Sequence, residues 1–213
     1  MMTHAYHEMY TSRVQDILGD AFDYAVNACG LSGNEFSELF SMSTISKRIA
    51  NGEPAYISGK SGIEIAVEVI FETKGIEIDI EQQINYEKSK EYWIGWAIAH
   101  YQWHSDRQFE DIFKALPYEK VERMYYPLHE ADLSKFAEIA DSKMKEYYPE
   151  TNLKRIRNTY GITQAGLAEA SGISLRSIQM YEQRNKNINK ASSETLYALS
   201  KVLGCTMEEL LEK

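Results

Sequence analysis

Four residues, Ser171-Gly172-Ile173-Ser174, separate two short helix patterns near the C-terminal end of this 213-residue chain. The first pattern begins after Thr163, a residue type that caps helix N-termini well. Gly172 is placed to end that helix in the left-handed conformation. The second pattern begins after Ser174, another good N-cap. So short a connection leaves too little chain for an antiparallel helix hairpin.

Further helix patterns flank this pair. The C-terminal segment therefore predicts five short helices, over residues 152–160, 164–170, 175–183 and 194–203 and in a last turn that begins at Thr206 with a capping box to Glu209. Small side chains at Ala165 and Ala168 let neighbouring helices approach closely. The order of helices fits a helix-turn-helix, which presents its second helix to the major groove of DNA.

Several runs of residues occur here in the order and spacing of one family. The run from Ile162 to Ser174, followed by Ile178-Gln179-Met180-Tyr181-Glu182, resembles the Cro/phage-repressor (XRE) helix-turn-helix family. Leu199 to Thr206 and Glu209-Leu210-Leu211 continue the resemblance, which covers residues 152–213. It implies a lambda-repressor-like DNA-binding domain of five helices. It also implies that double-stranded DNA is the partner and that the protein binds palindromic half-sites as a homodimer.

The resemblance assigns roles to individual positions. It implies a phosphate anchor at the start of the second helix, base contacts from the third helix, and a structural ion pair between Arg157 and Glu182. An arginine at position 176 can donate two hydrogen bonds to guanine, whereas lysines in the following loop suit phosphates. Arg184 has the alternative of complementing a helix C-terminus. The predicted DNA-binding residues are Gln164, Ser174, Leu175, Arg176, Ser177, Gln179, Met180, Arg184, Lys186 and Lys190.

Charge divides the chain in two. The whole chain carries a net charge of −9, but residues 151–213 hold nine Lys and Arg against six Asp and Glu, a net +3. Residues 1–150 carry the balance, −12. A confined basic segment can bind DNA on an acidic protein because salt screens charges beyond about 8 Å. A solvated basic face has the same charge pattern, so charge alone does not decide between them.

The sequence predicts an acidic helical domain over residues 1–150 and the DNA-binding domain over residues 151–213. The fold class is therefore mainly α. Apolar periodicity in the first domain predicts helices over residues 12–28, 34–40, 62–71, 87–104, 109–116 and 131–148. The alternation in residues 76–80 predicts a short strand. Dimerisation, ligand sensing and protein binding are alternatives for this domain.

The segment Tyr92–His104 is apolar on nearly every side. Such a helix is usually buried in a core, and we expect that here. The alternative is a ligand pocket lined by Trp93, Trp96 and Trp103. The length of this segment is roughly half the 20 residues that a helix needs to span a bilayer, so we expect no membrane insertion.

Two further patterns suggest a metal or nucleotide site only weakly. His100 and His104 share a helix face, but a metal site needs a third ligand, and His129 with Glu130 is only a candidate for it, at an unknown distance. Gly59-Lys60-Ser61 resembles the tail of a phosphate-binding loop, but Pro54 stands where the loop needs glycine. We read it as the turn that starts a helix. We therefore expect no metal, no cofactor and no enzymatic activity.

These features predict a cytoplasmic, sequence-specific DNA-binding transcription regulator, and specifically a repressor. Two cysteines give no disulfide framework, and the first 13 residues lack the apolar core of a secretory signal. The alternative is an antitoxin. In that case the acidic domain neutralises a protein toxin, and the C-terminal domain represses its own operon.

Overall fold

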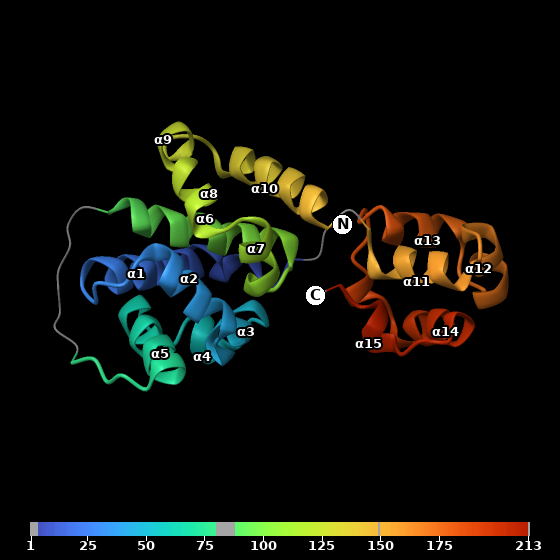
Figure 1. Cartoon of the computed structure of the whole chain (residues 1–213), viewed down its shortest axis with the longest axis horizontal. Helices are drawn as coiled ribbons and strands as arrows, with labels where there is room; N and C mark the ends of the chain where they lie inside the picture. The colour runs from blue at the N-terminus through green and yellow to red at the C-terminus, as the bar shows by residue number, and fades with distance from the viewer. Residues whose placement is uncertain (1–3, 80–87, 149, 213) are drawn as a thin grey trace. The chain divides into compact units, whose positions relative to one another are not determined.

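The computed structural model describes residues 4–79, 88–148 and 150–212 (Figure 1). These residues form two compact units, a larger unit of residues 4–147 and a smaller unit of residues 148–212. Within the described ranges the regular elements are all helices, which confirms the mainly α fold class. Residue 87, where one predicted helix begins, lies outside these ranges.

The larger unit contains all six helices predicted for its sequence, with ends moved by a few residues. Short helices between them were not predicted, because four to seven residues are too few to show a period. The elements are η1 (Glu8–Tyr10), α1 (Thr11–Asn27), α2 (Gly33–Met42), α3 (Thr44–Ala50), α4 (Pro54–Ile57), α5 (Gly62–Lys74), α6 (Lys90–Ser105), α7 (Phe109–Ala115), α8 (Tyr118–Arg123), α9 (Tyr125–Leu128) and α10 (Leu133–Tyr147).

The predicted strand at residues 76–80 is wrong for its described part. Gly75 ends α5 in the left-handed conformation, with φ of 68°. Residues 76–79 then run without helix or strand, and Ile80 lies outside the described residues. The side chain of Ile76 is 51% exposed. Alternating apolar residues form a strand only where another strand pairs with them, and the described ranges contain none.

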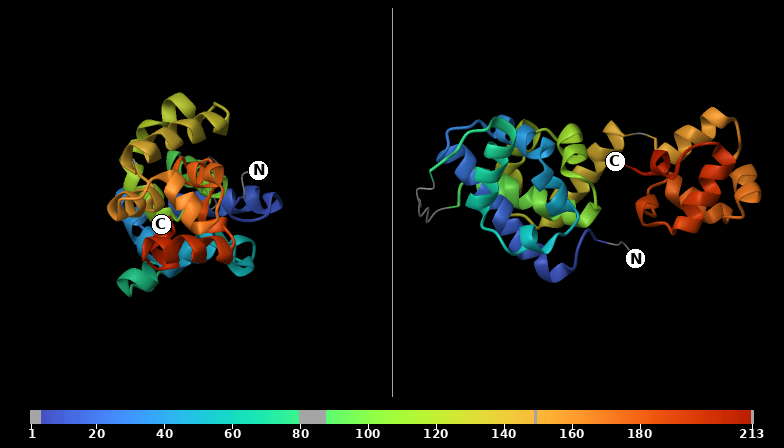
Figure 2. Two further views of the ribbon diagram at one scale, coloured as in Figure 1. Left: turned by 90° about the vertical axis from the view of Figure 1, so that its right-hand side faces the viewer. Right: turned by 90° about the horizontal axis from the view of Figure 1, so that it is seen from below.

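Helices α1 and α6 pack side by side and form the centre of the larger unit (Figure 2). A Cβ atom on Gly95 of α6 would lie 2.2 Å from the carbonyl oxygen of Leu18 in α1. One on Gly19 of α1 would lie 2.6 Å from the ring of Tyr92. The two glycines therefore let the helices approach closely. Aromatic rings fill the space beside them, as in the edge-to-face pair of Phe22 and Phe36, 4.9 Å apart.

The turn at Gly59-Lys60-Ser61 starts α5, as expected. The Ser61 hydroxyl accepts the backbone N–H of Glu64, and the Glu64 carboxylate accepts the backbone N–H of Ser61. This capping box satisfies two N–H groups at the helix start. Lys60 forms an ion pair with Glu68 one turn further along α5.

The smaller unit follows the predicted order of helices closely. The core of the smaller unit consists of eight buried side chains: Leu153, Leu167, Ile178, Tyr181, Ile188, Leu199, Leu203 and Leu210. The elements are α11 (Asn152–Tyr160), α12 (Gln164–Ser171), α13 (Leu175–Glu182), η2 (Ile188–Lys190), α14 (Ser193–Leu203) and α15 (Met207–Leu210).

Local caps set most of these boundaries. The hydroxyl of Thr163 accepts the N–H of Gly166 at 3.0 Å, and that of Ser174 accepts the N–H of Ser177 at 3.2 Å. Gly172 ends α12 with φ of 71°. These three predictions are confirmed, as is the capping box of Thr206 and Glu209.

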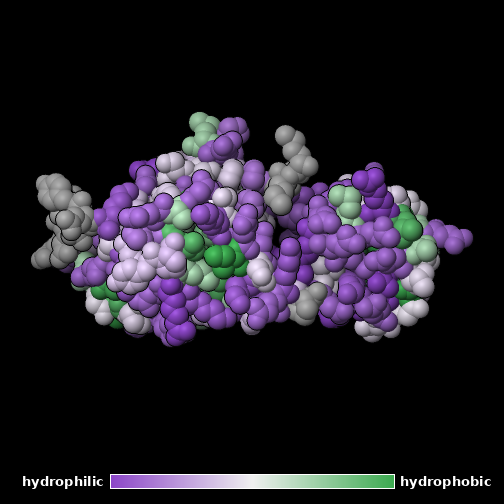
Figure 3. Space-filling model, turned by 90° about the horizontal axis from the view of Figure 1, so that it is seen from above, coloured by the Kyte–Doolittle hydropathy of each residue, from purple (hydrophilic) through white to green (hydrophobic). Residues whose placement is uncertain are grey.

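In the described part of the chain, no helix has the length and apolarity needed to cross a bilayer. The face drawn in Figure 3 is mostly hydrophilic, with small hydrophobic patches.

Candidate nucleic-acid interface

Apolar side chains on their core-facing sides hold helices α12 and α13 together. Leu167 of α12 and Ile178 of α13 are fully buried in the core of the smaller unit. Ile173, in the turn between the helices, packs against the same core. The inner faces of both helices are therefore fixed, and the outer face of α13 is left to solvent.

The first turn of α13 presents a short exposed surface. Arg176 is exposed and Leu175 is 40% exposed. The hydroxyls of Ser174 and Ser177, at the N-terminus of α13, are hydrogen-bonded to each other at 2.9 Å. Gln179 and Met180, one turn on, are half-buried. This surface combines one cation, two hydroxyls and an apolar contact, which are the groups that read base edges.

Gln164, at the start of α12, belongs to a buried network. Its amide nitrogen donates to Oε2 of Glu182 at 2.8 Å. Arg157 donates to both oxygens of the same carboxylate, from Nε at 2.5 Å and from Nη2 at 3.0 Å. The carboxylate raises the pKa of Arg157 above its usual value. The predicted ion pair is thus present, and it orients the Gln164 amide at the exposed end of α12.

Arg184 is directed into the smaller unit itself. The residue has φ of 57°. Its guanidinium donates to the carbonyl oxygens of Tyr148 at 2.5 Å and Glu150 at 3.1 Å, and to the carboxylate of Glu212 at 3.3 Å. The sequence left Arg184 two roles, complementing the C-terminus of α13 and contacting a DNA phosphate. Either role competes with these three hydrogen bonds for the guanidinium.

Lys186 and Lys190 lie in the segment after α13. Both side chains are exposed. The ammonium of Lys186 lies 4.9 Å from the centre of the Tyr181 ring, which is within cation–π range. Ile188, buried between them, anchors the segment to the core as the 3-10 helix η2. The loop is therefore ordered, and it holds two cations near the end of α13.

One residue that sequence reasoning missed is Glu212. Its carboxylate accepts the backbone N–H of Asn152 at 2.7 Å and also receives Arg184. Its own backbone N–H donates to Asn189 at 2.8 Å. Glu212 thus joins the start of α11, the loop after α13 and the C-terminal segment. The partners of Glu212 lie 23 to 60 positions away in the sequence, so no local pattern indicates them.

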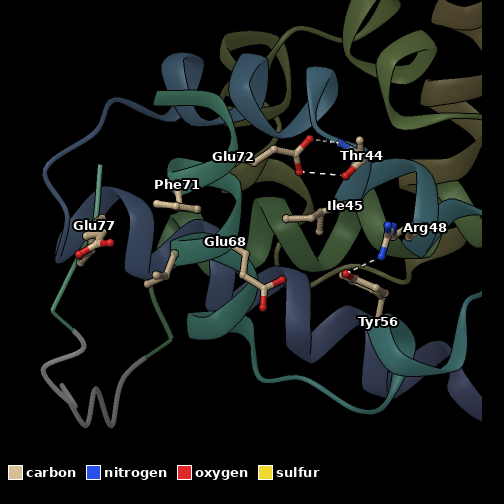
Figure 4. Close-up of a pocket in the computed structure, with 10 residues that line it drawn as sticks. Thr44, Ile45, Arg48, Tyr56, Glu68, Phe71, Glu72 and Glu77 are labelled. Atoms are coloured by element: carbon tan, nitrogen blue, oxygen red, sulfur yellow. Dashed lines mark hydrogen bonds between the residues drawn. The ribbon is translucent and has the colours of Figure 1, made fainter. Parts of the chain in front are cut away.

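The apolar helix α6 is buried as expected, since Trp93 and Trp103 are each only 8% exposed. A cavity of about 990 Å³ nevertheless opens beside it, lined by Trp96 and Trp103 but not by Trp93. A second cavity, of about 560 Å³, lies over α3, α4 and α5 (Figure 4).

The histidines of α6 do not assemble a metal site with the candidate third ligand, His129. The rings of His100 and His104 lie 6.5 Å apart between centroids. His129 instead stacks on Tyr125, with centroids 4.7 Å apart. Across the described ranges, His, Cys, Asp and Glu nowhere form a group of three placed to hold a metal ion.

Comparison with known proteins adds one match. Residues 153–210 match a helix-turn-helix family, of the Cro/C1-type (XRE) kind. The matched family is a DNA-binding regulatory domain, so the match supports a DNA-binding transcription regulator of the XRE type. No curated protein and no solved structure matches the chain.

Proposed function

We propose that the protein is a sequence-specific repressor that binds palindromic DNA as a dimer through its smaller unit. The observation that carries the proposal is the exposed first turn of α13, with Arg176 at its front, in a segment that matches a helix-turn-helix family. A dimer follows from the usual match between two-fold operators and two-fold proteins.

Base reading falls to the third helix of the smaller unit. Arg176 donates two hydrogen bonds to the O6 and N7 atoms of a guanine, and Leu175 contacts a thymine methyl group. Ser174, Ser177, Gln179 and Met180 complete this surface. These residues distinguish one sequence from another, since base edges carry the sequence information.

Phosphate contacts fix the register of the protein on DNA. Gln164 keeps one amide N–H for a phosphate while the other is bonded to Glu182. Lys186 and Lys190 supply exposed positive charges in the loop after α13. Arg184 contributes by holding the loop, because its guanidinium already bonds three groups of the smaller unit.

Selection from a random DNA library tests the proposal. The full-length protein should enrich a palindrome. Arg176→Ala should lose preference at one base of each half-site and weaken specific binding roughly 10- to 100-fold. Arg155→Ala is the matched control, since this arginine is also exposed and lies on α11. Unchanged affinity and sequence preference in Arg176→Ala would contradict the assignment of the recognition helix.

A second candidate is an antitoxin whose larger unit neutralises a protein toxin. The net charge of −12 on residues 1–150 favours a basic partner. Co-expression with the product of the neighbouring gene is the test. A stoichiometric complex that restores growth supports this function. Normal growth with that gene expressed alone would exclude it.

A further inference from the structure

The larger unit contains a cavity that the DNA-binding role does not use. Its volume is about 990 Å³, at the upper end of the range typical of small-molecule sites. Its walls come from α1, α6 and the start of α10, with Thr11 and Gln15 on the first, Trp96 and Trp103 on the second, and Asp132 before the third. All of these residues belong to the larger unit.

Thr11 carries a hydroxyl that lacks a protein partner. The residue is only 8% exposed, it lines the cavity, and its Oγ1 has no hydrogen bond to any described residue. An unpaired buried hydroxyl is costly; Oγ1 is itself covered, so a ligand bonds it once the Thr11 side chain rotates toward the cavity. The cavity of Figure 4 differs, because Thr44 bonds Glu72 and Arg48 bonds Tyr56 across it.

The charges around the cavity select for a cation. Four carboxylates line it, from Glu8, Asp132, Glu138 and Asp141, and none of the described lining residues is a lysine or arginine. Three histidines, His4, His100 and His104, also line it; burial lowers the pKa of His100, which favours its neutral form. The backbone N–H of Ser134 donates to Asp132 at 2.8 Å. Hydrogen bonds from Ser134 lower the pKa of that carboxyl group below its usual value.

Two indole rings supply the apolar side of the site. The N–H of Trp103 is already bonded to the carbonyl oxygen of Tyr6 at 2.9 Å, and His4 stacks on its ring with centroids 3.8 Å apart. Trp103 is therefore a fixed wall. Trp96 is half-buried. Indole faces attract organic cations because the ring quadrupole is negative at its face.

We propose that this cavity binds a small organic ammonium ion with an apolar or aromatic body. The body packs against Trp96 and Trp103, the carboxylates neutralise the charge, and, once the Thr11 side chain has rotated toward the cavity, an N–H of the ligand donates to its Oγ1. The site rests on residues of the larger unit alone, so it stands whether or not the smaller unit binds DNA.

Three probes of one shape test the charge preference. They are 2-phenylethylamine, which is cationic, 2-phenylethanol, which is neutral, and 3-phenylpropanoate, which is anionic. Each is titrated into the full chain, and binding is followed by the ¹H–¹⁵N signals of the three indoles. The amine should bind saturably with a Kd of about 1 mM or below and shift the signals of Trp96 and Trp103. The alcohol should bind at least about tenfold more weakly, because it lacks the charge.

Two variants test the residues. Thr11→Val removes only the unpaired hydroxyl, and Asp132→Asn keeps an acceptor for the Ser134 N–H. Each should weaken amine binding about tenfold. Thr11→Val should unfold at the same or a higher temperature. Glu130→Gln is the control, since this carboxylate is 89% exposed and does not line the cavity.

Three results would overturn the proposal. The first is no saturable amine binding by the wild-type chain at about 10 mM. The second is equal binding of all three probes, or strongest binding of the anion. The third is unchanged amine affinity in both Thr11→Val and Asp132→Asn, which would leave the hydroxyl and the carboxylate with structural roles only.

Discussion

Arg157 and Glu182 form a two-pronged ion pair that ties α11 to α13, with N–O distances of 2.5 and 3.0 Å. The side chains are only 10% and 2% exposed. The third guanidinium nitrogen, Nη1, donates to the carbonyl oxygen of Ile162 at 2.9 Å. The pair therefore fixes the helix that carries Arg176 against the first helix of the smaller unit.

Arg157→Met should destabilise the smaller unit strongly. The substitution leaves the carboxylate of Glu182 buried with Gln164 as its remaining partner, and breaking a buried pair on one side costs about 3–5 kcal/mol. Urea unfolding followed by amide NMR signals of residues 148–212 measures the loss. The double variant Arg157→Met, Glu182→Leu should recover most of the stability, because no buried charge is left unpaired. A loss below about 1 kcal/mol in the single variant would contradict a buried pair.

Lys186→Ala and Arg184→Ala should behave differently, although both remove one cation from the same loop. Lys186 is exposed, so its removal should lower the slope of log affinity against log salt by about one unit. It should cost at most about 1 kcal/mol of stability, from the cation–π contact with Tyr181. Arg184 bonds two carbonyl groups and Glu212, so its removal should lower the stability of the smaller unit. Parallel salt titrations and urea unfolding of both variants separate the effects. Equal results in both assays would show that the two cations share one role.

Gly95→Ala should destabilise the larger unit. The added Cβ atom would lie 2.2 Å from a backbone oxygen of α1 and 3.0 Å from the ring of Phe22. The close packing of α1 and α6 must then open, at a cost of at least about 1–3 kcal/mol, which exceeds the gain in helix propensity. Thermal unfolding measures the change. An unfolding temperature equal to that of the wild type would mean that α1 and α6 do not approach this closely.

Stability of the larger unit should depend on pH through His100. Burial, followed by the neighbouring His104 and His4, lowers the pKa of His100 below 6.5, against an opposing effect of Asp132. The unfolded chain therefore binds more protons as pH falls below 6.5, and stability is lost as pH falls toward the folded-state pKa. His100→Gln should flatten this part of the profile. Urea unfolding from pH 7.5 to 5 is the measurement, and an identical slope in the variant would contradict the assignment.

The sequence predicted best the features that local chemistry determines. The caps at Thr163 and Ser174 and the left-handed Gly172 depend on residues at most three positions away, so each could be read from the printed order. The pairing of Arg157 with Glu182 spans 25 positions and was found through the family resemblance alone.

The remaining features depend on distant contacts. The position of Arg184 against Tyr148 and Glu150, and of Glu212 against Asn152, follows from how the helices pack and leaves no periodic signal. The cavity beside α6 illustrates the same limit. The apolar pattern of that helix predicted burial, but only the fold brings Thr11 and Asp132 to the side of Trp96 and Trp103.

The most direct test of DNA recognition is binding of the full-length protein to the DNA upstream of its own gene, compared with scrambled DNA of equal composition, over a series of salt concentrations. We expect a sequence-selective complex with two-fold symmetry, whose affinity falls by about 0.9 log unit per phosphate contact for each tenfold rise in salt. A folded sample that binds neither DNA at low salt, or recovers no preferred site from a random library, would contradict it.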